Sequence, residues 1–218
     1  MKKILLAGAA VVALSLSAMG AAEAGLLQIT GGDAYTTPAN NDFSSPWEGR
    51  VNATTAMTVS TTAANVTLTY EFLFKEAGFV NTFTTSFGSF LNTAAIGTSV
   101  GGLQAAIDAL IFSFTTPSEP GNPLNNGDVA KLVGSGPDNY SFFATTNAPG
   151  GTAGVASGAM GNVVWLAFDD SGAQTDDNHD DMIIRVTATV VPEPASIALF
   201  GAGLLGLGLA RRVRRRTA

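Results

Sequence analysis

The stretch Asn65–Lys75, NVTLTYEFLFK, alternates apolar and polar side chains residue by residue. Successive side chains of a β-strand point to opposite faces, so a period of two predicts a half-buried strand rather than a helix. The predicted inward face consists of Val66, Leu68, Tyr70, Phe72 and Phe74. The stretch Asp181–Val190 has the same pattern, with the inward positions Met182, Ile184, Val186, Ala188 and Val190. Strands of this kind have to lie in a sheet that packs one face against a core.

Other segments extend the β pattern. We expect further strands within the apolar or threonine-rich segments 50–60, 79–87, 139–146 and 161–170. Turn-forming clusters separate them, for example TTPSEPGNPLNNGD and NAPGGTAG. Only GGLQAAIDALIF, residues 101–112, could form a helix of two or three turns. The sequence therefore predicts an all-β fold, a single antiparallel β-sandwich or jelly-roll-like domain.

The net negative charge of the central part of the chain argues against nucleic acid as a partner. Residues 25–190 carry four basic and fifteen acidic side chains, a net charge of −11, within a chain of 218 residues. Phosphate neutralisation needs clustered cations, so we expect no binding to nucleic acid. The chain has no cysteine, which excludes disulfides, thiolate metal sites and a cysteine nucleophile.

The N-terminus has the order of a secretory signal peptide. Lys2 and Lys3 precede an apolar run from Ile4 to about Leu16, and Ala22-Glu23-Ala24 supplies an A-x-A cleavage site. The sequence therefore predicts a signal peptide over residues 1–24, with Ala22 and Ala24 specifying cleavage after Ala24.

The C-terminus combines a proline-flanked peptide, an apolar stretch and a basic cluster. Residues 195–210 contain no charge and predict a transmembrane helix of about 24 Å, slightly shorter than a bilayer core. The basic cluster that follows, residues 211–216, comprises Arg211, Arg212, Arg214, Arg215 and Arg216. Cations near a span are retained on the cytoplasmic side, so the body is predicted to face outward, in agreement with the signal peptide.

The order Val191-Pro192-Glu193-Pro194, apolar helix and terminal arginines resembles the PEP-CTERM sorting signal of Gram-negative bacteria. The same signal is also catalogued as an ice-binding protein C-terminal domain, a label from which we infer no antifreeze activity. The resemblance covers residues 191–217 and implies recognition by an exosortase, a membrane-embedded cysteine protease-transpeptidase. It implies processing near Pro192–Pro194 and delivery to the cell surface or the exopolysaccharide matrix. The two prolines keep this peptide out of the helix, so it is predicted to be extended and open to a protease. A plain single-pass anchor is the alternative.

An aspartate-rich segment separates two of the predicted strands. Its oxygen-bearing side chains are Asp169, Asp170, Asp176, Asp177, Asn178, Asp180 and Asp181. Crowded carboxylates repel one another, and Ca²⁺ prefers six to eight oxygen ligands of this type. The spacing of Asp176, Asn178 and Asp180 copies the opening of a calcium loop, but the glycine and closing glutamate of an EF-hand are missing. The surrounding pattern is similar to a stretch of uncharacterised exported PEP-CTERM proteins. The segment is either a possible Ca²⁺ site or an acidic solvated hairpin that binds nothing.

Catalytic residues are harder to find. His179 is the only histidine, no G-x-S-x-G elbow is present, and we expect this histidine to be a solvated loop residue. A pair of carboxylates could hydrolyse glycosides, but nothing in the sequence marks such a pair. Trp165 is expected in the core, and Trp47 is expected to be a loop anchor or a sugar-stacking side chain.

These observations predict three parts: a signal peptide (1–24), a β-sandwich (25–190) and a sorting signal (191–218). The predicted function is that of an exported surface or extracellular-matrix protein with a structural or interaction role and no enzymatic activity. Its predicted partners are an exosortase-like protease, the secretion machinery, the membrane and exopolysaccharide. A Ca²⁺-dependent carbohydrate-binding module and a secreted carboxylate-based hydrolase are the alternatives.

Overall fold

Antiparallel strands make up nearly all the regular structure of the computed structural model. It describes residues 25–32, 55–117, 120–129, 131–132, 139–146, 157–170, 179–191 and 201–208. One short helix, residues 201–208, also lies within these ranges. The strands are β1 (Leu27–Gly31), β2 (Met57–Thr61), β3 (Val66–Phe74), β4 (Thr82–Thr85), β5 (Gly88–Leu91), β6 (Ser99–Gln104), β7 (Phe112–Thr115), β8 (Leu124–Asn125), β9 (Lys131–Leu132), β10 (Asn139–Thr145), β11 (Met160–Gly161), β12 (Val163–Asp169) and β13 (Met182–Val190).

The largest sheet has the strand order β6-β3-β13-β12-β10-β9. Strand β13 pairs with β12 on one side and with β3 on the other. The predicted alternation of both long strands is confirmed: the inward positions from Val66 to Phe72 and from Met182 to Ala188 are buried. At the strand ends, Phe74 is half-buried and packs against the core as predicted, whereas the prediction for Val190 is wrong, since its side chain is 38% exposed. Trp165 is half-buried and packs against the core.

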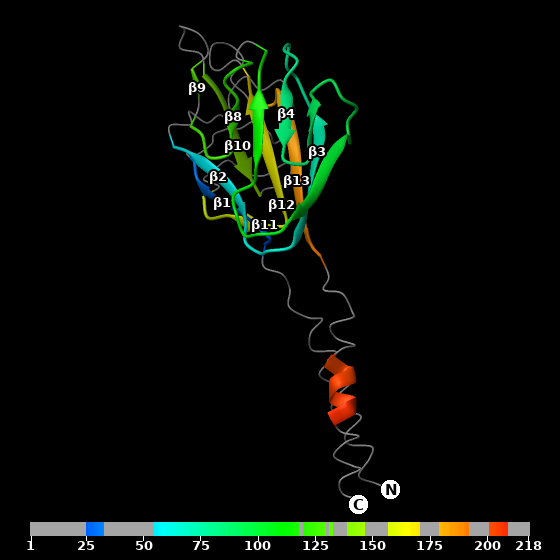
Figure 1. Cartoon of the computed structure of the whole chain (residues 1–218). Coiled ribbons are helices and arrows are strands. Elements are labelled where there is room, and N and C mark those ends of the chain that lie inside the picture. Colours follow the sequence, from blue (N-terminus) through cyan, green and yellow to red (C-terminus); the bar gives the residue numbers. More distant parts are fainter. Residues whose placement is uncertain are drawn as a thin grey trace, which may run out of the picture.

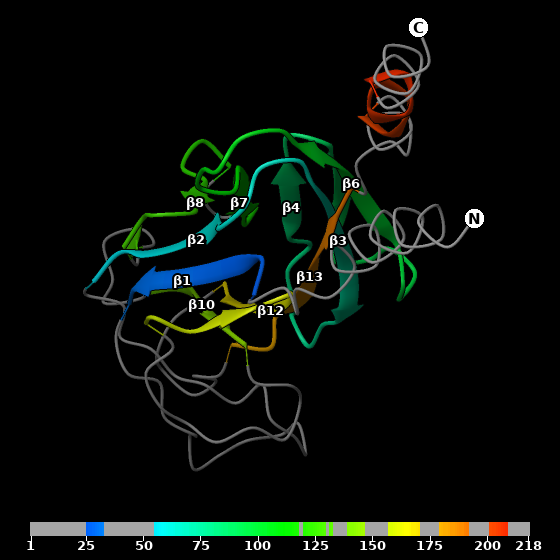
Figure 2. The same ribbon diagram turned by 90° about the horizontal axis from the view of Figure 1, so that it is seen from below.

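A four-stranded sheet, β5-β4-β7-β8, packs on the large one through aromatic side chains. Phe114 of β7 stacks on Phe168 of β12 with ring centroids 4.6 Å apart. The ring centroid of Phe83 of β4 lies 5.6 Å from that of Tyr70 of β3. Figure 2 shows β4, β7 and β8 on one side of the body, and β3, β13 and β12 on the other. The predicted all-β antiparallel sandwich is confirmed, because these aromatic pairs fill the space between two antiparallel sheets.

A small third sheet, β11-β1-β2, closes one side of the sandwich. Its inward side chains, among them Leu27, Ile29 and Val59, are fully buried. Asn126 beside β8 continues the hydrogen bonding, since its side chain accepts from Val59 N at 2.8 Å and donates to Val59 O at 2.8 Å. The β1–β2 pair is therefore joined to the four-stranded sheet.

The helix expected over residues 101–112 is wrong. Residues 99–104 form the edge strand β6, and β7 begins at Phe112. Leu103 and Ile107 are 54% and 63% exposed. Gly101 lies so close to β3 that an added Cβ would be 2.2 Å from Leu68 O. The missing side chain of Gly101 therefore allows the backbone of β6 to approach its neighbour.

Both chain ends leave the body at the same end of the sandwich. Leu26, just before β1, donates from its N to Asn162 Oδ1 at 2.8 Å. Ala188, near the end of β13, donates from its N to Asn162 O at 2.8 Å. Val191 N donates to Asn65 O at 3.1 Å, so the backbone hydrogen bonding of the body extends to Val191. Figure 1 shows the start of β1 and the end of β13 at this end of the sandwich, with the short helix outside the body. We call this end the tail pole and the opposite end the distal pole.

Candidate functional site

Strand β12 ends and strand β13 begins at the same end of the sandwich. The first and the last residues of the aspartate-rich segment therefore lie close together. Phe168 of β12 pairs with Met182 of β13, so the residues that follow and precede them meet at the distal pole. Asp176, Asp177 and Asn178 lie outside the described residues, whereas the other predicted side chains are described. The exposed fractions are 3% for Asp169, 2% for Asp170, 1% for His179, 1% for Asp180 and 7% for Asp181.

These burials correct two expectations. The base of the aspartate-rich segment is not a solvated hairpin, and His179 is not a solvated loop residue. His179 Nε2 lies 2.7 Å from Ser141 Oγ, and its ring lies edge-on to Phe143 at 5.3 Å. Ser141 comes from β10, where it pairs with Asp169 of β12. The sequence could not show this contact because 38 residues separate the two partners.

Two asparagines that the sequence analysis missed donate hydrogen bonds to these aspartates, one to a carboxylate and one to a backbone carbonyl. Asn81 precedes β4 and Asn92 follows β5, and the two residues bond to each other around the β4–β5 hairpin. The Asn81 side chain donates from Nδ2 to Asp170 Oδ2, and Asn92 Nδ2 donates to Asp181 O at 3.4 Å. Asp170 N donates to Asp181 Oδ2 at 2.7 Å. We refer to Asn81, Asn92, Asp170 and Asp181 as the acid–amide cluster.

The acid–amide cluster connects the two main sheets, because its asparagines flank strands of one sheet and its aspartates flank strands of the other. Asn81 and Asn92 are 0% and 1% exposed. Both follow an apolar residue and precede a threonine, VNT and LNT. That repeated context is a weak sequence signal, and it gives no indication that the aspartates lie nearby.

The electrostatics of the acid–amide cluster are dominated by burial. The pKa of Asp181 is raised to about 9, first by burial and then by the neighbouring carboxylate of Asp170. The hydrogen bond from Asp170 N opposes this rise, while Asp169 and Asp180 add to it. With no cation bound, Asp181 therefore retains its proton at neutral pH.

The described residues do not include three or more histidine, aspartate or glutamate side chains placed around one point so as to hold a metal ion. The calcium set predicted from sequence is thus untested as a whole, since three of its members lie outside the described ranges. Of the other four, Asp170 and Asp181 are joined directly by a hydrogen bond.

An open groove borders the acid–amide cluster on the side of β3. It has a volume of about 460 Å³ and a mostly apolar wall that includes Phe72, Phe74 and Ile96. Lys75 and Asn92 supply its polar atoms. Asn92, a member of the cluster, therefore forms part of the groove wall, although only 1% of the residue is exposed.

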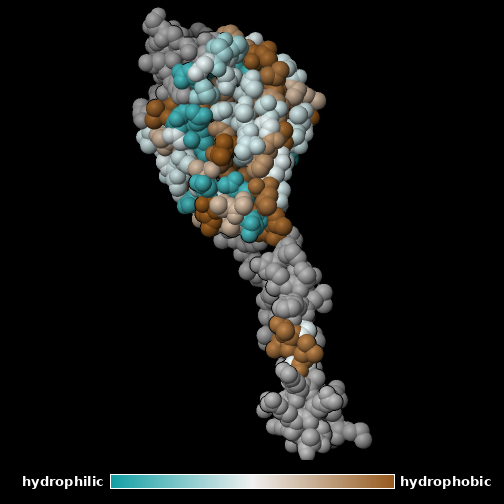
Figure 3. Space-filling view, in the orientation of Figure 1, coloured by the Kyte–Doolittle hydropathy of each residue, from teal (hydrophilic) through white to brown (hydrophobic). Residues whose placement is uncertain are grey.

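The sorting segment begins where the sheet ends. Val191 is 44% exposed, whereas Pro192, Glu193, Pro194 and the arginines of 211–216 lie outside the described residues, as do Ala22 and Ala24. The helix over 201–208 exposes Leu204, Leu205 and Leu207 by 54%, 63% and 69%. Figure 3 shows this helix as an apolar segment away from the body. Within the described ranges, no helix has both the length and the apolar character needed to span a bilayer.

Fold and tail together define a class: a two-layered antiparallel β protein whose last strand leads directly into a C-terminal sorting segment. Residues 190–216 match the PEP-CTERM protein-sorting motif. The chain therefore carries the sorting signal of an exported protein that an exosortase processes and that is directed to the cell surface. No curated protein and no solved structure gives a significant match to the chain.

Proposed function

We propose that the β-sandwich is a structural or interaction module of the cell surface or exopolysaccharide matrix, and that it has no enzymatic activity. The observation that carries the proposal is the position of the sorting motif, which starts at the end of β13. An exosortase-like enzyme cuts near Pro192–Pro194 and releases the body from a membrane-anchored precursor.

The non-enzymatic role is supported by the burial of the one serine–histidine pair found among the described residues. Ser141 and His179 are 4% and 1% exposed, so their polar atoms are not presented to a substrate. A nucleophile has to reach the reacting atom, and this pair instead binds β10 to the start of β13. The hydrogen bond therefore contributes to the fold.

Processing can be tested by mass spectrometry of the chain from cells with and without the exosortase gene. We expect exported material that ends near Pro192–Pro194 in the parent strain and an intact, membrane-bound chain in the deletion strain. A Pro192→Ala, Pro194→Ala double variant should also stay unprocessed, because the motif is lost. Exported protein with an intact C-terminus at Ala218 would contradict the proposal.

The matrix role needs a separate measurement. We expect the processed protein to co-purify with the extracellular polymer fraction and to be released when the polysaccharide is degraded. Protein found wholly in the soluble medium would argue against association with the matrix, while leaving the sorting step intact.

A further inference from the structure

The carboxylates of the acid–amide cluster are buried. Asp170 and Asp181 are 2% and 7% exposed, and Asp169 and Asp180 adjoin them at 3% and 1%. Moving an ionised carboxylate out of water is costly unless a positive partner is close by. Four acidic groups in one buried region therefore favour a ligand that carries positive charge.

A second and independent observation comes from Asn81. Its side chain is 0% exposed, and its amide lies against Asp170 through Nδ2. The other atom of that amide, Oδ1, is buried and accepts no hydrogen bond from the described residues. A buried carbonyl oxygen is rarely left without a donor or a cation, so this atom indicates a missing ligand.

We propose that the acid–amide cluster is a Ca²⁺ site, in which the carboxylates of Asp170 and Asp181 and the Oδ1 atom of Asn81 bind the ion. Asp181 Oδ2 accepts the Asp170 N–H, so Asp181 Oδ1 is the oxygen assigned to the cation. Water and backbone carbonyl oxygens complete the shell of six to eight ligands. Only two acidic side chains are used, which agrees with the lack of any three-acid arrangement among the described residues.

The ligand chemistry favours Ca²⁺ over other divalent ions. All three protein ligands are oxygens, whereas the usual Zn²⁺ sites of proteins include histidine or cysteine. The nearby imidazole nitrogen His179 Nε2 is already within 2.7 Å of Ser141 Oγ. Mg²⁺ requires near-octahedral geometry at short distances, whereas Ca²⁺ accepts an irregular shell of six to eight oxygens, so an irregular site favours Ca²⁺.

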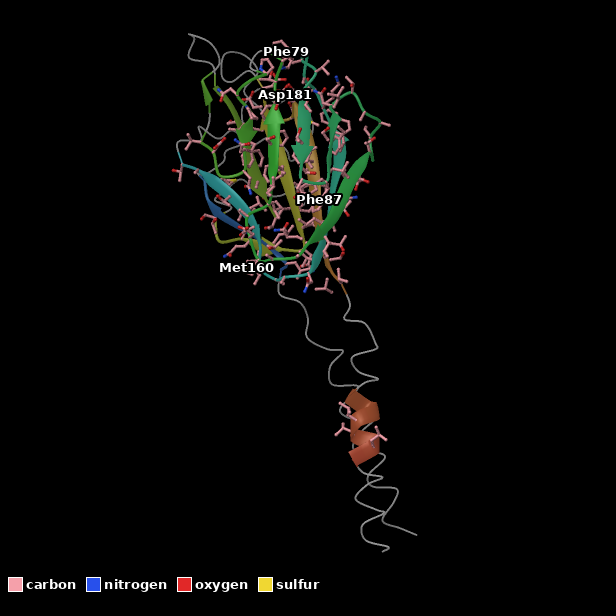
Figure 4. All side chains as sticks on the ribbon, in the orientation of Figure 1. Phe79, Phe87, Met160 and Asp181 are labelled. Atoms are coloured by element: carbon pink, nitrogen blue, oxygen red, sulfur yellow. The ribbon has the colours of Figure 1, made fainter. Side chains whose placement is uncertain are left out.

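The position of the site gives the ion a mechanical role. Asn81 and Asn92 hold the β4–β5 hairpin, while Asp170 and Asp181 hold the turn end of β12 and β13. A cation among them would clamp the two sheets together at the distal pole. Figure 4 places Asp181 at this pole, away from the tails. Extracellular calcium modules bind in the range of about 10⁻⁴–10⁻³ M, so the site would fill after export.

The test measures thermal unfolding and calorimetric Ca²⁺ binding of the full chain in a mild detergent, in EDTA, with Ca²⁺ and with Mg²⁺. We expect one Ca²⁺ per chain. At about a hundredfold excess over the dissociation constant, the melting temperature should rise by about 5–10 °C. Mg²⁺ should give a much smaller rise. No rise with Ca²⁺, or an equal rise with both ions, would overturn the proposal.

Two variants locate the ion. Asp181→Asn should abolish the Ca²⁺-dependent rise, whereas Asp108→Asn, the same exchange at an exposed loop residue, should retain it. A full response in Asp181→Asn would place the ion elsewhere and refute the assignment. If Asp181→Asn does not fold, Asn81→Asp decides the question. An added carboxylate should destabilise the protein in EDTA and tighten Ca²⁺ binding, and unchanged binding would reject the site.

Discussion

The carboxyl group of Asp181 differs in its protonation at neutral pH between the unfolded and the folded chain. In the unfolded chain it is an ordinary carboxyl with a pKa of 3.8. In the folded domain it lies beside Asp170, with Asp169, Asp180 and His179 in the same buried region. Burial in this acidic environment raises its pKa to about 9, so folding in the absence of a cation takes up a proton.

This proton uptake predicts that the free energy of unfolding, measured in EDTA, depends on pH. A carboxyl with a raised pKa contributes stability below its unfolded pKa and loses that contribution as the pH rises towards about 9. Between about pH 7 and 8.5, an exposed carboxyl of ordinary pKa is ionised in both the folded and the unfolded chain, so it adds no pH dependence. The free energy of unfolding from urea titrations should therefore fall, by up to about 1.4 kcal/mol per pH unit.

The control for this prediction is Asp181→Asn, whose side chain does not titrate. Its stability in EDTA should vary much less over the same pH range. A wild-type stability that rises with pH in EDTA would show that Asp181 is ionised in the folded protein.

At the scale of the element, local patterns predicted the long strands well and failed where long-range contacts decide the structure. The period of two in β3 and β13 identified the inward side chains from Val66 to Phe72 and from Met182 to Ala188 correctly. The helix over 101–112 was wrong because local spacing could not show that Gly101 lies against Leu68 O. The acid–amide cluster was only half predicted, since 89 residues separate Asn81 from Asp170.

Gly101 allows a direct test of strand against helix. In a helix, Gly101→Ala would stabilise the protein by about 1 kcal/mol, because alanine is the better helix former. In β6 the new Cβ would be 2.2 Å from a backbone oxygen of β3, so one of the strands has to move. We expect a loss of about 1–3 kcal/mol in the free energy of unfolding, measured by urea titration.

The matched control is Gly121→Ala in a turn, where an added Cβ meets nothing within 4 Å. This variant should differ little from the wild type. Equal effects of the two substitutions would contradict the close approach of β6 to β3.

At the scale of the whole molecule, the proposed membrane-anchored precursor would hold the tail pole close to the bilayer and the distal pole away from it. The chain enters β1 and leaves β13 at the tail pole. The nine residues of β13 rise by about 3.3 Å each, which places the acid–amide cluster about 30 Å further from the anchor. The proposed Ca²⁺ site therefore faces the outside of the cell.

This orientation can be measured because the chain has no native cysteine to interfere with labelling. Phe79 and Met160 have similar exposures of 45% and 48% and lie near opposite poles in Figure 4. A fluorophore on Met160→Cys of the full chain in vesicles should be quenched strongly by acceptors in the lipid headgroups, and one on Phe79→Cys only weakly. Equal quenching at the two positions would contradict an upright body.

The place of β13 in the large sheet also determines when the domain can become stable. It is the last strand before the sorting motif, yet it lies in the interior of the sheet, between β3 and β12. A chain emerging from the ribosome or the translocation channel therefore lacks this interior strand until Val190 has been delivered. The complete large sheet cannot assemble before β13 has followed β3 and β12 out of the channel. A product truncated before β13 exposes two unpaired strand edges, so housekeeping proteases can recognise it before it reaches the surface.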